Sequence, residues 1–146
     1  MIHGTHNAEP DERNEDILIY VNGEMLPRSE AKISVFDSGY LVGDGIWEGI
    51  RLYDGKLAFV DLHLDRLWDG AASIGLKLCW SKAELEQIVY GVLLKNAMHT
   101  DVHVRIMVTR GIKKTPSQDP RLTISGPNLV IIAEHKKAST ETTSKG

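Results

Sequence analysis

The run SGYLVGDGIWEGIRLYDGKLAFVDLHLDRL, from Ser38 to Leu67, decides the fold because it joins a strand, a tight hairpin and the start of a helix. Side chains alternate between the two faces of a strand, so the segment 45–53 would place its aliphatic residues on one face. The other face would carry an aromatic ring, a bare backbone and a cation, at Trp47, Gly49 and Arg51. Such a face is poorly suited to a plain core and indicates a binding surface.

Tight hairpins are predicted at two places, one before this run and one inside it. Asn22-Gly23 and Asp54-Gly55 suit the type I′ turn, because both of its central residues need a positive φ. Each pair lies between short apolar runs, which predicts antiparallel strand pairs. The predicted strands are 17–21, 24–26, 45–53, 57–60, 102–109 and 128–134.

Two amphipathic stretches predict helices. One covers 61–74, with Asp61 expected as its N-cap. The second follows a capping box made by Ser81 and Glu84, and its apolar residues continue at helical spacing to about Ala97. Because short hairpin connections favour antiparallel pairing, the expected fold class is α+β, an antiparallel sheet with two helices.

The chain has 146 residues, of which 42% are apolar, enough for one domain with its own core. We expect a flexible tail over 1–16, one domain over 17–134 and the start of a linker over 135–146. A net charge of -3 without a basic stripe, and the lack of an apolar run of about 18 residues, favour neither nucleic acid nor a membrane as partner. A single cysteine, Cys79, expected to be buried or half-buried, and an N-terminus without a signal-peptide core fit the cytoplasm.

Metal and nucleotide sites are not expected. His63, His99 and the nearby aspartates fit no compact zinc spacing. The sequence Gly43-Asp44-Gly45 lacks the third glycine and the following helix of a dinucleotide-binding fingerprint. The two histidines of the tail, His3 and His6, are interpreted as tail residues rather than ligands.

Three separated motifs carry a resemblance to a known family: EGIR at 48–51, an Asp-Gly hairpin at 54–55, and HLDRL at 63–67. With them, the segment 17–146 resembles the small N-terminal domain of the fold-type IV (class IV) pyridoxal-phosphate aminotransferases. These include the branched-chain and D-amino-acid transaminases and their lyase relatives. The resemblance implies transfer of an amino group between an amino acid and a 2-oxo acid.

The resemblance also implies roles for individual residues. Arg66, the arginine of the family's HxxR helix, would hold the cofactor phosphate, for which a bidentate guanidinium is well suited. Trp47, Gly49 and Arg51 would line the pocket for the substrate side chain and carboxylate. Glu48 points to the opposite, apolar face, so we expect it to bond to a nearby cation or to backbone amides in a structural role.

The strand 102–109 carries mixed signals about the substrate. Arg105 resembles the branched-chain subfamily's carboxylate-binding arginine, and His103 on the same face would assist it or would be an edge-of-core histidine. The sequence Thr109-Arg110-Gly111 instead resembles D-amino-acid and amine transaminases, with Arg121 as a further candidate carboxylate contact. Branched-chain amino acids are the leading substrates; D-amino-acid or (R)-amine transaminases and aminodeoxychorismate-lyase-like enzymes are the alternatives.

The resemblance places the Schiff-base lysine in a C-terminal domain beyond Gly146, so no catalytic residue is expected within the chain. The 146-residue chain is therefore expected to be inactive alone, with pyridoxal 5'-phosphate and a homodimer expected for the full-length enzyme. An alternative of another class is a non-catalytic binding or assembly module.

Overall fold

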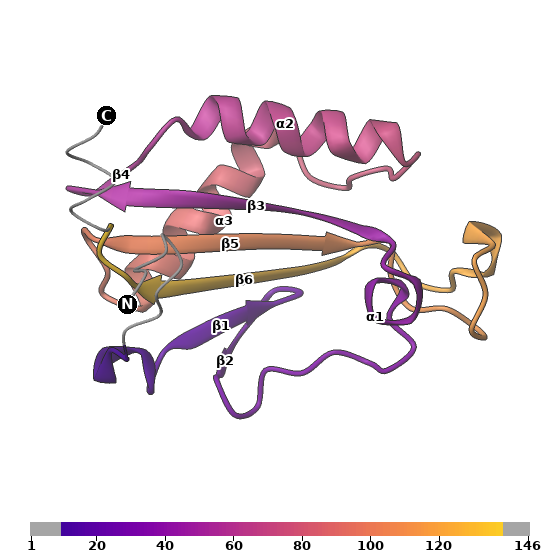
Figure 1. Cartoon of the computed structure of the whole chain (residues 1–146), viewed down its shortest axis with the longest axis horizontal. Coiled ribbons are helices and arrows are strands. Elements are labelled where there is room, and N and C mark those ends of the chain that lie inside the picture. The colour runs from indigo at the N-terminus through magenta and orange to yellow at the C-terminus, as the bar shows by residue number, and fades with distance from the viewer. Residues whose placement is uncertain (1–9, 139–146) are drawn as a thin grey trace, which may run out of the picture.

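A computed structural model describes residues 10–138, and these form an antiparallel sheet covered by helices on one face (Figure 1). The strands are β1 (Leu18–Val21), β2 (Glu24–Pro27), β3 (Gly45–Tyr53), β4 (Lys56–Leu57), β5 (Val102–Thr109) and β6 (Asn128–His135). Their order in the sheet is β2-β1-β6-β5-β3-β4, and every neighbouring pair is antiparallel. The predicted α+β class is confirmed.

Two long helices, α2 (Val60–Ser73) and α3 (Lys82–Lys95), follow the sequence prediction. In Figure 1, α2 runs along β3 and α3 crosses behind the sheet. The capping box at Ser81 is confirmed, since its side chain accepts from the amide of Glu84 and the Glu84 carboxylate accepts from the amide of Ser81. The described residues also contain a short helix, α1 (Ser38–Val42), and two 3-10 turns, η1 (Glu12–Asn14) and η2 (Pro120–Leu122).

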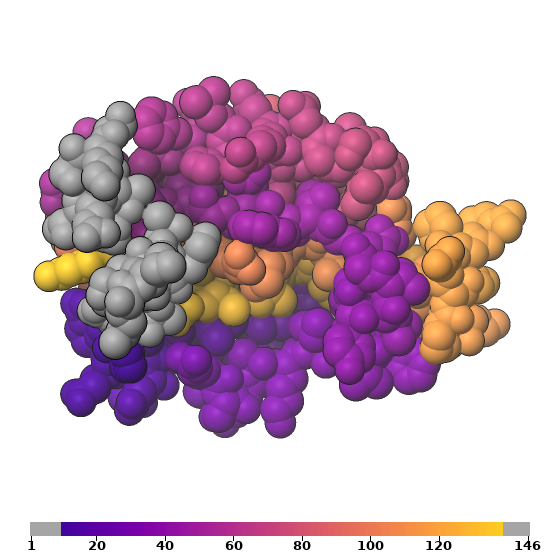
Figure 2. Space-filling view, in the orientation of Figure 1, coloured from indigo at the N-terminus to yellow at the C-terminus, as the bar shows by residue number. Residues whose placement is uncertain are grey.

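The core lies between the sheet and these two helices. Alternate residues of β5 and β6 are almost completely buried and pack with the inner faces of α2 and α3, which predicts strong hydrophobic stabilisation from this layer. The opposite sheet face is not covered by α2 or α3, and Figure 2 shows atoms of β5 and β6 between β3 and the segment before α1. The core residues of the two central strands are Val102, Val104, Ile106, Val108, Leu129, Ile131 and Ala133.

The start of α2 differs from the prediction. Asp61 is not the N-cap; the helix begins at Val60, and Phe59 occupies the cap position with φ of 52° and no side-chain cap bond. That left-handed residue also ends the preceding strand, so β4 covers only Lys56–Leu57 rather than 57–60. The last contact with β3 before this turn is the hydrogen bond from the amide of Ala58 to the carbonyl of Arg51 at 2.8 Å.

Two further expectations need correction. Part of the expected tail 1–16 has structure: η1 lies there, and Asn14 exchanges two hydrogen bonds with the backbone of His135, at 2.7 and 3.0 Å. The histidines His3 and His6 lie outside the described residues. Cys79 is exposed rather than buried. In the connection before α3 successive side chains alternate between core and solvent, and its neighbours Leu78 and Trp80 are the half-buried ones.

Candidate functional site

The predicted site residues of β3 and β5 lie together on the open face of the sheet. The two strands pair in register from end to end, so residues of equal parity face the same side. On this face, a row of charged and aromatic groups crosses both strands. The cross-strand pairs are Trp47 with Met107, Gly49 with Arg105, and Arg51 with His103.

Trp47 and Arg105 form a stacked pair at the centre of this face. The guanidinium carbon of Arg105 lies 4.0 Å from the centroid of the Trp47 ring. Both side chains are exposed, with 59% of Trp47 accessible to solvent. A cation over an indole at this distance is attracted by the ring quadrupole, and the stack orients a guanidinium that remains open to an anion.

Gly49 and His103 fit each other closely beside the stack. A Cβ at position 49 would lie 2.8 Å from Nε2 of His103, so only glycine leaves room for the imidazole in this position. Burial, together with the positive charges of Arg51, Lys136 and Arg105, lowers the pKa of His103 from 6.5 to about 4. His103 is therefore a neutral imidazole at neutral pH. Arg51 is oriented by a hydrogen bond from its Nη1 to the carbonyl of Lys136.

Glu48 lies on the opposite, helix-covered face and is almost fully buried, with 4% of its surface exposed. Arg66 of α2 donates from Nε to Oε1 at 2.6 Å and from Nη2 to Oε2 at 2.8 Å. Nδ1 of His63 lies 2.8 Å from Oε2, in hydrogen-bonding contact. The guanidinium of Arg66 holds the pKa of Glu48 below its usual range. The expectation that Glu48 bonds to a cation is thus confirmed.

The sheet separates Arg66 from the other predicted site residues. Its partner Glu48 shares the buried face with Ile50, whereas Trp47, Gly49 and Arg51 point to the open face. Trp47 and Glu48 are nevertheless consecutive residues of β3, which pairs with β4 only through Leu52 and Tyr53. A ligand that touches both Arg66 and the residues of the open face must therefore lie at the outer edge of β3.

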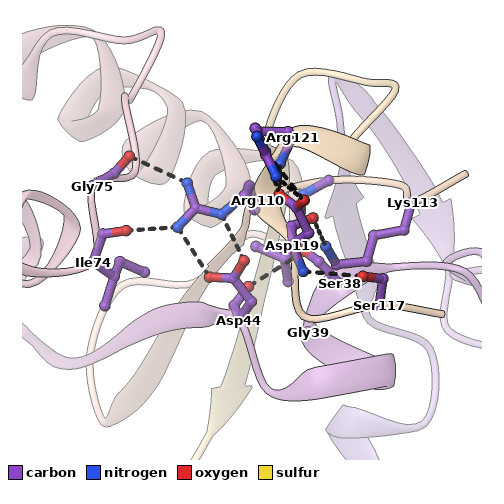
Figure 3. A network of polar contacts seen from close by, with 12 residues as sticks. Ser38, Gly39, Asp44, Ile74, Gly75, Arg110, Lys113, Ser117, Asp119 and Arg121 are labelled. Carbon is purple, nitrogen blue, oxygen red and sulfur yellow. Dashed lines mark hydrogen bonds and ion pairs between the residues drawn. The ribbon is translucent and has the colours of Figure 1, made fainter. Parts of the chain in front are cut away.

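Arg110, predicted from the Thr-Arg-Gly motif, joins three segments at one end of the sheet (Figure 3). Its Nε donates to Oδ2 of Asp44 at 2.6 Å, and its Nη2 and Nη1 donate to the carbonyls of Ile74 and Gly75 at 2.7 and 3.2 Å. Both side chains of the ion pair are largely buried. These bonds tie the entrance of β3 to the end of α2, and they occupy the guanidinium.

Arg121 lies in η2 and pairs with Asp119 through its Nε and Nη2, the latter at 2.7 Å (Figure 3). Its side chain is exposed on the loop between β5 and β6 rather than on the face that carries Arg105. Lys113 in the same loop is buried, and its Nζ donates to the carbonyl of Asp119 at 3.0 Å. This lysine therefore holds the loop together.

Sequence reasoning missed Asp37 and the hollow beside it. Asp37 is fully buried and accepts hydrogen bonds from Thr109 and Asn128, both at 2.6 Å, and from the amides of Gly39 and Tyr40. Its position directly before a Ser-Gly pair was the available signal, since aspartate is a strong N-cap. The hollow, of about 350 Å³, is mainly apolar and lies on the same sheet face as Trp47. Its lining includes Ile19, Val21, Ile33, Tyr40, Met107 and Val130.

Within residues 10–138, no cluster of three or more histidine, cysteine or acidic side chains could hold a metal ion. Among the described helices, none has the length and apolar character needed to cross a membrane.

Comparison with known proteins gives consistent matches. The family model for class IV aminotransferases matches residues 45–145. The branched-chain-amino-acid aminotransferase-like protein 1 of Arabidopsis thaliana is 38% identical over 127 residues, which cover 87% of this chain and 23% of that protein. The D-alanine aminotransferase of Staphylococcus aureus (strain MSSA476) is 40% identical over 110 residues, covering 71% of this chain and 39% of that protein.

Solved structures give the same fold. The branched-chain aminotransferase of the archaeon Thermoproteus uzoniensis with norvaline has a TM-score of 0.67 at 23% identity, covering 81% of this chain and 40% of that one. The branched-chain amino acid aminotransferase from Escherichia coli has a TM-score of 0.67 at 25% identity, covering 82% of this chain and 41% of that one. The chain thus spans between about a quarter and two fifths of the length of these four proteins.

Proposed function

The chain belongs to the class IV aminotransferase family, and from this we propose that it forms the N-terminal part of a pyridoxal-phosphate-dependent transaminase. The full-length enzyme would move an amino group between a branched-chain amino acid and a 2-oxo acid. The observation that carries the proposal is the face on which Arg105 stacks over Trp47 beside Gly49 and Arg51. A family match without such a face would support the fold alone.

The residues of this face would bind and orient the substrate. The guanidinium of Arg105, held flat on Trp47, is suited to a carboxylate, with which it can form two parallel hydrogen bonds. Arg51 adds a second positive charge, and the neutral His103 can donate or accept one hydrogen bond without adding charge. Gly49 leaves room for the His103 ring between them. The apolar hollow next to Met107 would take an aliphatic side chain.

Arg66 fits the phosphate of the cofactor. Its side-on contact with Glu48 uses Nε and one hydrogen of Nη2, and the pair of N–H groups at the end of the guanidinium makes no hydrogen bond within residues 10–138. That pair matches two oxygens of a phosphate. Pyridoxal 5'-phosphate, when bound, supplies the electron sink that stabilises a carbanion at the substrate Cα. The domain's own part is to hold the phosphate end and to position the substrate carboxylate.

A homodimer and a second domain of the same polypeptide are part of the proposal. Val35, Phe36, Tyr40 and Val42 expose apolar surface around α1, next to the hollow. Exposed apolar surface of this kind marks an interface in soluble proteins. A cytoplasmic location is also proposed, supported by the exposed thiol of Cys79, which a reducing compartment would keep free.

A second candidate is a D-amino-acid transaminase. The D-alanine aminotransferase of Staphylococcus aureus matches this chain at 40% identity, which favours that candidate. A domain exchange separates the two. In the test, this domain replaces the matching N-terminal part of that enzyme, and amino transfer from L-leucine and from D-alanine is measured.

The proposal expects the exchanged enzyme to accept L-leucine, and Arg105→Tyr to reduce turnover of L-leucine more than of D-alanine. Arg28→Tyr is the matched control, because Arg28 is exposed after β2, away from this face, and donates to the carbonyl of Asn14. Turnover of D-alanine alone would favour the second candidate. A folded, cofactor-loaded exchanged enzyme that transfers from neither donor would contradict the transaminase proposal.

A further inference from the structure

Glu48 is an expensive residue to bury and therefore needs an explanation. A carboxylate in an apolar layer is tolerated only when charge and hydrogen bonds compensate for lost water. Three nitrogen atoms surround it here, two from Arg66 and one from His63, and all belong to α2. An apolar residue would pack α2 against β3 without this cost, so attachment of the helix alone does not account for Glu48.

The geometry of the contact sets the orientation of Arg66. The carboxylate meets the side of the guanidinium, at Nε and Nη2, and both distances are short, at 2.6 and 2.8 Å. Five N–H groups in a rigid plane belong to each guanidinium, so fixing the side fixes the direction of the end. Although Glu48 is buried, 72% of the Arg66 side chain remains exposed. One end of the ion pair is thus anchored in the core while the other faces solvent.

His63 restrains the carboxylate in turn. Nδ1 of its ring contacts Oε2, the same oxygen that accepts from Nη2 of Arg66. His63 and Arg66 are three residues apart, so successive turns of α2 present both groups to one carboxylate. With both oxygens engaged, the carboxylate cannot rotate without breaking at least two contacts.

We propose that Glu48 is a positioning residue, which holds Arg66 side-on so that the two N–H groups at the end of its guanidinium stay directed at an oxyanion of the phosphate-monoester class. This inference rests on the proposed function, because that function assigns the phosphate to Arg66. It predicts that phosphate and Glu48 bind Arg66 at the same time, on different edges of the guanidinium. The opposite case is competition, in which phosphate displaces Glu48.

The test uses the 146-residue chain and inorganic phosphate, followed by NMR of the Arg66 side chain and the Glu48 carboxylate. Simultaneous binding requires that phosphate shifts the Nη resonances of Arg66 while the Nε–H signal and the Glu48 carboxylate signal stay in place. Displacement would move the Nε–H and carboxylate signals together with the Nη signals. That result would overturn the positioning role, and it needs no variant.

Variants give an independent answer. Glu48→Gln keeps the shape of the side chain but weakens its hydrogen bonds to Arg66, so we expect faster exchange of the Arg66 Nε–H. Arg66 would then have to be immobilised when phosphate binds, which for one long side chain lowers the affinity about two- to tenfold. Loss of the negative charge acts in the opposite direction, but salt screens it at this exposed end. Asp65→Asn is the matched control, because the Asp65 carboxylate pairs with Lys82 of α3 at 2.6 Å and makes no hydrogen bond or ion pair with the Arg66 side chain.

The outcomes also separate this inference from the function on which it rests. Unchanged or tighter phosphate binding by a folded Glu48→Gln protein would show that Glu48 does not position Arg66. Binding by that variant but not by the unaltered chain would show that Glu48 blocks Arg66, which again overturns the inference and leaves the phosphate role intact. Binding by neither, or binding that persists in Arg66→Leu, would contradict the phosphate role itself.

Discussion

Replacing Asp37 with alanine tests how the end of the sheet next to the hollow is held together. The carboxylate is fully buried and accepts four hydrogen bonds, at 2.6 Å from Thr109, 2.6 Å from Asn128, 2.8 Å from the amide of Gly39 and 3.3 Å from that of Tyr40. Alanine removes the N-cap of α1, which costs about 1 kcal/mol. It also leaves the buried amide of Asn128 without this acceptor, at a cost of about 1–3 kcal/mol.

We therefore expect Asp37→Ala to lower the free energy of unfolding by about 3 kcal/mol, which corresponds to a fall in Tm of about 10 °C for a domain of this size. Urea unfolding followed by circular dichroism measures the change. Asp61→Ala is the control: the same chemical change at an exposed residue that caps nothing should cost about 0.5 kcal/mol or less. A loss at Asp37 no larger than at Asp61 would refute the reasoning.

Three further changes test other parts of the structure. The pKa of His103 is about 4 in the folded state and 6.5 in the unfolded state, so the unfolded chain binds more protons between these two pH values. The free energy of unfolding should therefore fall by about 1–2 kcal/mol as the pH drops from 6.5 to 4, after allowance for the partial exposure of the ring. His103→Gln should remove that part of the pH dependence in urea titrations, and an unchanged profile would contradict the shift. Gly111 has a φ of 121°, and Gly111→Ala drives a Cβ into the carbonyl oxygen of Gly126, so it should lower the free energy of unfolding by about 2–3 kcal/mol. Gly43→Ala is the control, because a Cβ there meets open space and should cost about 1 kcal/mol. Equal falls in Tm for the two variants would argue against the close approach at Gly111. Arg110→Met should lower the free energy of unfolding by about 2–3 kcal/mol, because Asp44 loses its partner. It should also speed amide hydrogen exchange at the end of α2, because the carbonyl of Ile74 loses its hydrogen bond. Faster exchange confined to the loop after β5 would count against this.

Alternation and turn chemistry predicted much of the fold from the sequence. The alternating residues were enough to place Trp47 with Arg51 on one face of β3 and His103 with Arg105 on one face of β5, because strand geometry leaves no other choice. The pairing of β3 with β5, which brings the two sets together, came from the structure. Asn22 and Asp54 adopt the positive φ that their hairpins required, at 49° and 45°. These are local rules, and they hold wherever the tertiary structure does not override them.

The features that were missed depend on contacts between distant parts of the chain. Asp37 caps α1, but its other partners lie 72 and 91 residues away, and no periodicity reports them. Phe59 adopts a left-handed conformation because β4 and α2 must meet there, against its own preference. For Glu48, the sequence indicated a cation but not which one. The separation of Arg66 from the rest of the predicted site by the sheet followed only from the structure.

The strand order has a consequence for how this chain is made. β1 pairs with β6, so the first strand of the domain meets the last, and the amide of Leu129 bonds to the side chain of Asn22 across the seam. During synthesis, the hairpin of β1 and β2 therefore leaves the ribosome long before its partner exists. Until β6 arrives, β5 offers an unpaired edge to any neighbouring chain. Folding dominated by such distant pairings is slow, so β5 stays open to pairing with other chains until synthesis reaches His135.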